Sequence, residues 1–327
     1  MSELYLNDYA NEAVEKSPIR KGYGEGLKKA GELNDDVVAL CADLTESTQM
    51  HLFKEAFPDR FFEVGVAEQN LVTVGSGLAA MGKIPFVSSY AAFSPGRNWE
   101  QIRTTISLND RPVKIVGSHA GLYTGADGAT HQMLEDIALM RVLPNMVVIV
   151  PGDAVEAEKA TLALAKDSRP AYLRLAREAT PIVTTDKTPF EIGKAYLMRE
   201  GGALSLISTG TMTYKALMAA RQLANDGIEV DVLHIPTIKP LDAIAIIKSA
   251  SKTGVVITIE EAQINGGLGG AVSELLSEHK PTYVYRMGMQ DHFGESGTPD
   301  ELFDHFGLSI KHIVFKAHAV LSELKKQ

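Results

Sequence analysis

The sequence predicts an α/β protein in which a parallel-sheet domain is followed by a smaller α/β domain. Two series of short apolar segments alternate with helix patterns, an order typical of parallel strands covered by helices on both faces. With 327 residues and 45% hydrophobic content, the chain is long enough to bury two cores. Its 28 glycines suit the tight turns that join strands to helices in such folds.

The first series follows a polar segment, residues 1–17, that we expect to form a helix or an arm. Each expected strand is a short and almost wholly apolar run, as strands buried on both faces are. The expected strands are residues 37–40, 83–87, 113–117, 146–150 and 171–175. The expected helices are residues 20–33, 71–82, 99–108, 134–142 and 154–165.

The alternation pauses over residues 177–190, a stretch with two prolines, four threonines and little periodicity. We place the domain linker there, which divides the chain into residues 1–187 and residues 188–327. The second series has expected strands at residues 204–208, 230–234, 255–260 and 282–286. Its expected helices are residues 214–226, 241–251, 269–277 and a final helical stretch over 299–327.

The net charge and the cysteine content limit the classes of molecule that the chain is expected to bind. The chain carries 32 basic and 41 acidic residues, a formal charge of −9, which argues against general binding to nucleic acid or to membrane surfaces. An anionic substrate must therefore be held by a local basic cluster. The single Cys41 excludes an internal disulfide and a cysteine metal cluster, and its apolar surroundings favour a buried structural thiol. We see no signal peptide or membrane span and expect a soluble cytoplasmic protein.

One segment, residues 62–82, combines a catalytic residue type with an unusual helix. Glu68 stands where a short strand and loop give way to a helix, and an acid there can cap the helix or point into a cleft. We expect one apolar stripe on that helix, formed by Leu71, Val74, Leu78 and Met81. Gly75 and Gly77 lie inside the helix, where each costs about 1 kcal/mol relative to alanine. Close approach of another backbone, as in a subunit interface, would explain them; a capping glutamate on a tightly packed helix is the simpler interpretation.

Polar and aromatic side chains gather where the strands of the first series end. Ligands of open parallel sheets bind at the carboxyl ends of the strands. Each residue taken alone has a structural explanation, such as a core aromatic, a loop histidine or a surface charge, but their coincidence on one edge favours a site. The residues are Asp43, Ser47, Glu68, Ser88, Ser89, Tyr90, Phe93, His119, Asp127, His131, Arg174 and Arg177.

Three runs give the chain a family resemblance. They are residues 65–68 (Gly-Val-Ala-Glu), residues 125–132 (Gly-Ala-Asp-Gly-Ala-Thr-His-Gln) and residues 141–146 (Arg-Val-Leu-Pro-Asn-Met). With them the sequence resembles the thiamine-diphosphate-dependent transketolase family, and the second run is the most specific of the three. The resemblance implies a pyrimidine-binding domain over residues 1–187 and a transketolase C-terminal domain over residues 188–327.

The resemblance also implies roles at the cofactor. Glu68 matches the glutamate that hydrogen-bonds the aminopyrimidine ring of thiamine diphosphate. Tyr90 and Phe93 match the aromatic positions that pack around that ring, and Asp43 matches a residue close to the thiazolium. A carboxyl group sheltered by aromatic rings keeps its proton more readily than one in water, so it can share a proton with a ring nitrogen. The cofactor then supplies the carbanion chemistry, while the protein supplies position and electrostatics.

On the substrate side, Asp127 and His131 match residues that handle the sugar hydroxyls. Arg20, Ser47, His119 and Arg177 match positions that hold the substrate phosphate, with Arg174 as an alternative to Arg177; every phosphate position therefore carries a suitable donor in this sequence. The implied reaction is transfer of a two-carbon ketol unit from a ketose phosphate to an aldose phosphate, as in the pentose phosphate pathway. Histidines suit the proton transfers that each step needs.

The chain departs from the family in one large respect. It contains no Gly-Asp-Gly, the motif that with a later Asn holds the cofactor diphosphate through a divalent ion; residues 152–154 lack the last glycine. The resemblance therefore implies the C-terminal subunit of a split transketolase. A partner subunit would hold the diphosphate and the metal, Mg or Ca, and we assign no metal ligand to this chain. Two copies of each subunit are the expected assembly.

Three alternatives stay open. The chain has the size of a beta subunit of a 2-oxoacid dehydrogenase, but that class should lack the 125–132 run and the full phosphate cluster. A relative of 1-deoxyxylulose-5-phosphate synthase would carry a similar run. A non-catalytic binding protein is disfavoured by the presence of Glu68, Asp127 and His131. In the second domain, Glu260-Glu261 and the glycine-rich residues 264–270 could cradle a phosphate, but we favour structural packing there.

Overall fold

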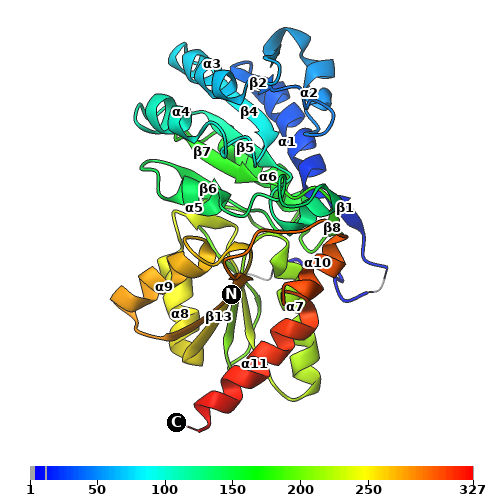
Figure 1. Ribbon diagram of the computed structural model, residues 1–327, viewed down its shortest axis with the longest axis vertical. Helices are drawn as coiled ribbons and strands as arrows, with labels where there is room; N and C mark the ends of the chain where they lie inside the picture. Colours follow the sequence, from blue (N-terminus) through cyan, green and yellow to red (C-terminus); the bar gives the residue numbers. More distant parts are fainter. Residues whose placement is uncertain (1–3, 12, 327) are drawn as a thin grey trace.

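The computed structural model describes residues 4–11 and 13–326. Two α/β domains follow one another along the long axis of the molecule, the first in the upper half of Figure 1 and the second in the lower half. This confirms the predicted order of a mainly parallel α/β domain and a smaller α/β domain. No helix among the described residues is long and apolar enough to cross a bilayer.

The first half of the chain supplies two kinds of element in strict alternation after its N-terminal arm. The strands are β1 (Lys16–Pro18), β2 (Val37–Cys41), β3 (Phe61–Glu63), β4 (Ile84–Tyr90), β5 (Lys114–Ser118), β6 (Val147–Ile149), β7 (Ala171–Arg174) and β8 (Ala179–Pro181). The helices are α1 (Ile19–Leu33), α2 (His51–Ala56), α3 (Glu68–Ala80), α4 (Trp99–Gln101), α5 (Asp136–Arg141) and α6 (Ala154–Leu164). Three short non-α turns complete it: η1 (Pro58–Arg60), η2 (Ile102–Ser107) and η3 (Leu122–Asp127).

The second half repeats the alternation on a smaller scale. Its strands are β9 (Tyr196–Arg199), β10 (Ser205–Ser208), β11 (Asp231–His234), β12 (Thr237–Lys239), β13 (Val255–Gln263) and β14 (Tyr283–Met289). Its helices are α7 (Met212–Asn225), α8 (Ala243–Thr253), α9 (Leu268–His279), α10 (Pro299–His305) and α11 (Ile310–Leu324). Every strand and helix predicted from the sequence has a counterpart, and most ends differ by a few residues. The predicted helix over 99–108 is α4 followed by the π-helical η2, and the stretch over 299–327 is divided into α10 and α11.

Both sheets are parallel apart from one edge strand each. The seven-stranded sheet has the order β12-β6-β7-β5-β4-β2-β3, and the five-stranded sheet has the order β14-β13-β10-β11-β9. The antiparallel edges are β12, which pairs with β6 of the first half, and β9, which pairs with β11. The sequence analysis missed both edges because segments of three and four residues are too short to show a period.

The predicted linker is not structureless. Its residues Ala179–Pro181 form β8, which pairs antiparallel with β1 in the register Lys16 to Pro181. Upstream, Leu6 forms an isolated bridge with Thr184. The N-terminal segment is therefore an arm that is held against residues 179–184, and Figure 1 shows it crossing the middle of the molecule beside β1 and β8.

The alternation of side chains along each strand explains why helices cover both faces of the large sheet. Val37, Ala39 and Cys41 of β2 belong to the buried cluster that also contains residues of α1 and α6. Val38 and Leu40 belong to the opposite cluster, which contains residues of α3. All five are fully or almost fully buried.

Helix α3 buries a face that overlaps only part of the predicted stripe: Leu71 is buried and Leu78 is partly buried, but the other two members are exposed. Its buried residues are Glu68, Leu71, Val72, Gly75 and Ala79, whereas Val74 is 36% and Met81 is 81% exposed. A Cβ on Gly75 would lie 2.7 Å from Val87 Cγ1 of β4. Gly75 is therefore required by packing inside the chain, not by a subunit interface, because the small face lets α3 sit close on the sheet. Val74 and Met81 are left on the outside, where Gly77 also faces open space.

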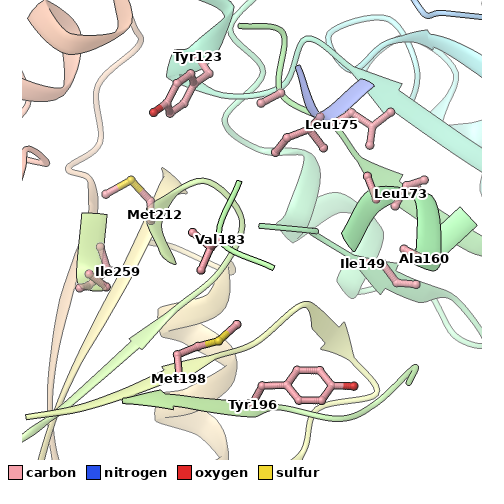
Figure 2. Packing of buried hydrophobic residues seen from close by; sticks show 14 of the residues in the cluster. Tyr123, Ile149, Ala160, Leu173, Leu175, Val183, Tyr196, Met198, Met212 and Ile259 are labelled. Atoms are coloured by element: carbon pink, nitrogen blue, oxygen red, sulfur yellow. The ribbon is translucent and has the colours of Figure 1, made fainter. Parts of the chain in front are cut away.

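The two domains share their packing. One buried cluster contains Ile149 and Leu173 of the large sheet together with Met198, Met212 and Ile259 of the second domain. Figure 2 shows these side chains converging around Val183 at the junction. Beside this junction α10 packs against η3, as Figure 1 also shows.

Candidate functional site

Most of the predicted site residues lie at the carboxyl ends of β2, β4, β5 and β7 and at the start of α3, on one edge of the large sheet, and Arg20 joins them from the first turn of α1. The strands here are adjacent and parallel, so the loops that follow them leave the sheet on the same side. Contacts between side chains connect most of these residues into one array, which we call the site array. Its members are Arg20, Ser47, Glu68, Tyr90, Phe93, Arg97, His119, Asp127, His131 and Arg177.

Glu68 forms one end of the site array. Its side chain is 2% exposed, and its Oε2 accepts a hydrogen bond from Arg97 Nη1 at 2.7 Å. Asn98 holds the start of α3 in place, because its Nδ2 donates to the backbone oxygen of Glu68 at 2.8 Å. Glu68 and Arg97 line an open groove of about 560 Å³ together with Gln69 and Thr73. A buried carboxylate with one half-exposed cation partner can exchange that partner for another donor.

Aromatic rings continue the array from Arg97. The Arg97 guanidinium lies over the Phe93 ring at 4.8 Å, and the Phe93 and Tyr90 rings are stacked with centroids 6.2 Å apart. Tyr90 in turn stacks on the His119 ring at 3.8 Å. His131 meets Phe93 edge to face at 5.5 Å. Two aromatic rings and two imidazoles thus form one wall, with the carboxylate at one end of it.

Cationic groups occupy the other end of the site array. Arg20 Nη1 donates to the backbone oxygen of Ser47 at 2.5 Å, and Arg20 Nε donates to the backbone oxygen of Arg177 at 3.2 Å. Burial, together with the charges of Arg20 and Arg177, lowers the pKa of His119 to about 3. His119 is therefore neutral at physiological pH, between two guanidinium groups. Such a cluster can hold an anion by charge-assisted hydrogen bonds.

Asp127 and His131 lie beside this cationic end. Asp127 Oδ1 is 3.4 Å from Arg177 Nη1, and the same Nη1 donates to the backbone oxygen of Thr124 at 3.0 Å. The His131 Nδ1 shares a hydrogen bond of 2.9 Å with the Thr130 hydroxyl. The loop turns through Gly125 and Gly128, both at positive φ, and this brings the two predicted sugar-handling residues next to Arg177.

Two predicted residues adopt a left-handed backbone directly after a strand. His119 has φ +56° after β5, and Asp43 has φ +57° after β2. Such strain in a non-glycine residue concentrates at functional sites. Asp43 is nonetheless separate from the site array. Within the described residues its carboxylate makes no hydrogen bond or ion pair, and only its backbone N–H is engaged, donating to Glu63 Oε1 at 2.7 Å.

Arg174 does not point into the site array. It is 3% exposed, its Nε donates to Asp136 Oδ2 at 2.8 Å, and its Nη1 is 3.4 Å from Glu261 Oε1 of the second domain. Successive side chains of a strand point to opposite faces of the sheet. Arg174 lies on β7 and Arg177 lies beyond its end, so the two side chains point to different parts of the structure. This leaves Arg177 as the arginine that faces Asp127 and Arg20.

Sequence reasoning missed Arg97. The available signal was its position four residues after Phe93 and one residue before Asn98, in the turn that follows β4. No local pattern in the sequence indicates a cation beside Glu68, because the contact joins two separate segments, the β4–α4 turn and the start of α3. The glycine-rich loop of the second domain is packed as expected: both oxygens of Glu260 accept backbone hydrogen bonds there, from Leu268 and Gly269, each at 2.8 Å.

The described residues fit one end of thiamine diphosphate. The buried Glu68 carboxylate next to Phe93 and Tyr90 suits a flat heterocycle with a ring nitrogen and an exocyclic amine. Over residues 4–11 and 13–326 there is no group of three or more His, Cys, Asp or Glu side chains that could hold a metal ion. Glu68, Tyr90 and Phe93 are the residues of this chain that would hold the aminopyrimidine end of the cofactor.

Comparison with known families finds two matching domains. Residues 15–183 match the transketolase pyrimidine-binding domain, and residues 193–313 match the transketolase C-terminal domain. Together the two matches cover most of the chain; the first ends inside the predicted linker at residue 183, and the second begins at residue 193, three residues after that linker.

Individual relatives are similar over their whole length. The solved structure of a split gene transketolase, an inactive beta4 tetramer, is 43% identical, with a TM-score of 0.88, over 93% of this chain and 98% of that one. The 6-deoxy-6-sulfo-D-fructose transketolase subunit SqwH of Clostridium sp. is 40% identical over 94% of this chain and 95% of its own. One of the subunits of the apulose-4-phosphate transketolase of Phocaeicola vulgatus is 37% identical over 88% of this chain and 93% of its own.

Proposed function

The chain belongs to the transketolase family, and we propose that it is the C-terminal subunit of a two-chain transketolase that moves a two-carbon ketol unit from a ketose phosphate to an aldose phosphate. The observation that carries the proposal is the site array, in which a buried carboxylate, an aromatic wall and an arginine-histidine cluster follow one another along one edge of the sheet. The proposed setting is the pentose phosphate pathway of the cytoplasm.

The carboxylate end of the array is assigned to the cofactor. Transketolases generally use thiamine diphosphate with a divalent metal, and the bound cofactor supplies the nucleophilic carbon for breaking and making carbon–carbon bonds. In this chain Glu68 would hold a proton between its Oε2 and a ring nitrogen, after Arg97 has moved away from that oxygen. Tyr90 and Phe93 would fix the ring plane and exclude water from it. Asp43 keeps its assignment near the thiazolium as a proposal.

The cationic end is assigned to the substrate. Arg20, Ser47, His119 and Arg177 would bind the phosphate far from the reacting carbons, and that remote binding energy orients the other end of the sugar. Neutral His119 would donate a hydrogen bond rather than a charge. His131 and Asp127 would then exchange protons with the hydroxyl and carbonyl oxygens of the sugar, at the point where the two ends meet.

The missing diphosphate site is assigned to a partner subunit with Gly-Asp-Gly and a later Asn, in an α2β2 assembly. The loop before α3 supports this assignment, because its Val66 is exposed and lines the Glu68 groove, while Val74 is exposed on the outer face of α3. Apolar side chains that stay exposed next to a site commonly mark an interface. The isolated chain is therefore expected to bind the cofactor weakly and to have no activity.

The sugar itself is open within this proposal. Relatives of similar length are named for a sulfo sugar and for a sugar phosphate. A sulfonate and a phosphate are both tetrahedral oxyanions, and two guanidinium groups suit either. Transfer from a 6-sulfo ketose is therefore the second candidate function. The intact cationic cluster argues against the beta subunit of a 2-oxoacid dehydrogenase, whose substrates carry no such group.

Reconstitution with the partner subunit tests the proposal. The purified pair, with thiamine diphosphate and Mg²⁺, is expected to convert xylulose 5-phosphate and ribose 5-phosphate, while either chain alone converts nothing. Parallel assays use 6-deoxy-6-sulfofructose as donor, pyruvate with glyceraldehyde 3-phosphate, and pyruvate with a dye acceptor. Faster turnover in either pyruvate assay would replace the proposal with the corresponding alternative. Micromolar binding of thiamine diphosphate to the isolated chain would refute the partner requirement.

A further inference from the structure

We propose that the second domain serves the reaction by positioning the loop that carries the substrate-binding side chains, and that Glu261 is the positioning residue. The loop in question, residues 119–133, is called the site loop below; it carries His119, Asp127 and His131. The catalytic consequence of this inference rests on the proposed function. The positioning itself rests only on contacts within the chain.

Glu261 joins three elements at one buried point. Its side chain is 3% exposed at the carboxyl end of β13. Oε1 accepts from the Thr211 hydroxyl at 2.7 Å and lies 3.4 Å from Arg174 Nη1, while Oε2 accepts from the backbone N–H of Tyr123 at 3.2 Å. One carboxylate of the second domain thereby holds the start of α7, the end of β7 and the site loop.

The site loop passes directly over this ion pair. Gly121 has φ +75°, and a Cβ there would lie 2.5 Å from Glu261 Oε2 and 2.6 Å from Arg174 Nη2. Arg174 is held from the other side by Asp136, which also accepts from the Tyr172 hydroxyl at 2.7 Å. Because the charged groups are excluded from water, their mutual attraction is strong and their positions are fixed. The loop backbone is therefore seated on a rigid base.

Further contacts from the second domain hold the rest of the site loop. Gln132 is buried, and its Nε2 donates both to Gly125 O and to Glu295 O at 2.8 Å. Just past the loop, the Gln263 N–H donates to Leu134 O at 2.9 Å. The Tyr123 ring packs on Phe303 of α10 with centroids 5.0 Å apart, and Figure 2 shows Tyr123 on the side of the junction that faces the second domain.

The cofactor side of the site array is built on other elements, although the rings of Tyr90 and Phe93 contact His119 and His131 of the site loop. Glu68 begins α3, and Tyr90 and Phe93 belong to β4 and the turn after it. None of the contacts of Glu261 reaches these elements. Loss of Glu261 should therefore displace the substrate-binding side chains and leave the cofactor side in place, a split that a general loss of stability would not produce.

Kinetics of the reconstituted enzyme test this split. Glu261→Gln and Glu261→Ala are compared with Glu260→Gln, a matched control on the neighbouring residue, whose carboxylate serves only the 268–269 turn. With saturating cofactor, we expect the kcat/KM for the sugar phosphate to fall by about 10- to 100-fold in both Glu261 variants, because displacements near 1 Å have effects of this size. The apparent Kd of thiamine diphosphate should not change. An equal fall in Glu260→Gln, or an equal loss of cofactor affinity, would overturn the inference.

Amide hydrogen exchange in the full chain supplies a readout that does not need activity. Peptides from the site loop should exchange faster in Glu261→Gln and in Thr211→Val than in the unmodified chain, while peptides of α3 and β4 keep their rates. Gly121→Ala is compared with Gly227→Ala, which has the same φ of +75° but open space at the Cβ. Only the former should loosen the site loop. If the loop loosens as expected but the assembled enzyme is inactive, the proposed function fails and the positioning stands; unchanged exchange in Glu261→Gln refutes the positioning.

Discussion

The carboxyl edges of the two sheets offer an instructive comparison. Both sheets are mainly parallel, and both place ionisable side chains at the same edge. At the large sheet, the side chains of Asp127 and Arg177 remain partly exposed, and Glu68 opens on a groove. At the small sheet, Glu260 and His234 are fully buried. The difference lies in the partners that the chain itself provides.

Each polar group at the edge of the small sheet is already bound within the protein. Glu260 accepts two backbone hydrogen bonds from the start of α9. His234 Nε2 is 2.8 Å from Glu156 Oε2 of the first domain, and its Nδ1 shares a 2.6 Å hydrogen bond with the Thr213 hydroxyl. A hydroxyl, an imidazole and a carboxylate in this order resemble a catalytic triad, but no substrate can reach them. The comparison teaches that polar residues at a strand end indicate a site only where some of their hydrogen-bonding groups have no partner within the protein.

The largest expected effect is a difference in kcat between substitutions of Glu68 and of Glu260. Glu68→Gln should lower the kcat of the assembled enzyme by about 10²- to 10⁴-fold, because an amide cannot hold the proton that the cofactor ring requires. Glu260→Gln should leave the kcat nearly unchanged. Steady-state assays at saturating cofactor measure both variants. Comparable activity of Glu68→Gln and the unmodified enzyme would remove the basis for treating the two edges differently.

The second-largest effect is expected from a substitution at the cationic end of the site array. Arg177→Gln is expected to raise the KM for a phosphorylated acceptor by about 10- to 100-fold, since a charge-assisted hydrogen bond contributes about 1.5–3 kcal/mol. The KM for glycolaldehyde, which carries no phosphate, should stay the same. Arg199→Gln is the control, because Arg199 forms a surface pair with Glu229 in the second domain at 2.7 Å. A parallel rise in the KM for glycolaldehyde would contradict the assignment.

The buried triad should affect stability and not catalysis. His234→Phe removes one hydrogen bond each from Glu156 and Thr213, which keep their bonds to the Gly152 N–H and the Ser208 hydroxyl, at a cost of about 0.5–1.5 kcal/mol for each lost bond. Urea denaturation should show the lower free energy of unfolding, and the kcat per folded complex should match that of the unmodified enzyme. If His234→Phe abolished turnover at full stability, the edge of the small sheet would hold a second active centre.

The pH dependence of stability should have opposite signs at the two edges. Because the pKa of His119 is about 3 in the folded chain and 6.5 ordinarily, its contribution is present above pH 6.5 and is lost as the pH falls toward 3. Burial raises the pKa of Glu260 from 4.5 to about 7, so its contribution is present below pH 4.5 and is lost as the pH rises toward 7. Each slope is about 1.4 kcal/mol per pH unit.

Urea midpoints from pH 4 to pH 8 measure these slopes. His119→Asn should flatten the loss of stability on the acid side, and Glu260→Gln should flatten the loss between pH 5 and pH 7. The Arg20 and Arg177 charges near His119 stay constant over this range, as do those of Arg174 and Arg286 near Glu260. His131, the third group whose charge acts on His119, is present both in the unmodified chain and in His119→Asn, so it contributes to both curves. Flattening of the same limb by both substitutions would show that the two edges do not differ in this way.

Much of the fold followed from local pattern. The strands of both series are apolar runs between turn residues, and burial on both faces of a parallel sheet demands that pattern. The antiparallel strands β9 and β12 escaped detection because they are short and their pairing is non-local. On α3 the period was right but the face was only partly right: Leu71 is buried as the stripe predicts, whereas Val74 and Met81 are exposed and Gly75 packs on Val87 instead.

By itself, the sequence determined the order of the elements, the residue types at the strand ends and the motifs of the family, because these are local properties of the chain. Only the tertiary structure decided which polar groups are free. It placed Arg97 beside Glu68, buried Arg174 between Asp136 and Glu261, and seated the site loop on the second domain. The physical reason is that a side chain's partner comes from whichever element the fold brings within about 3 Å, and that distance is set by packing across the whole molecule.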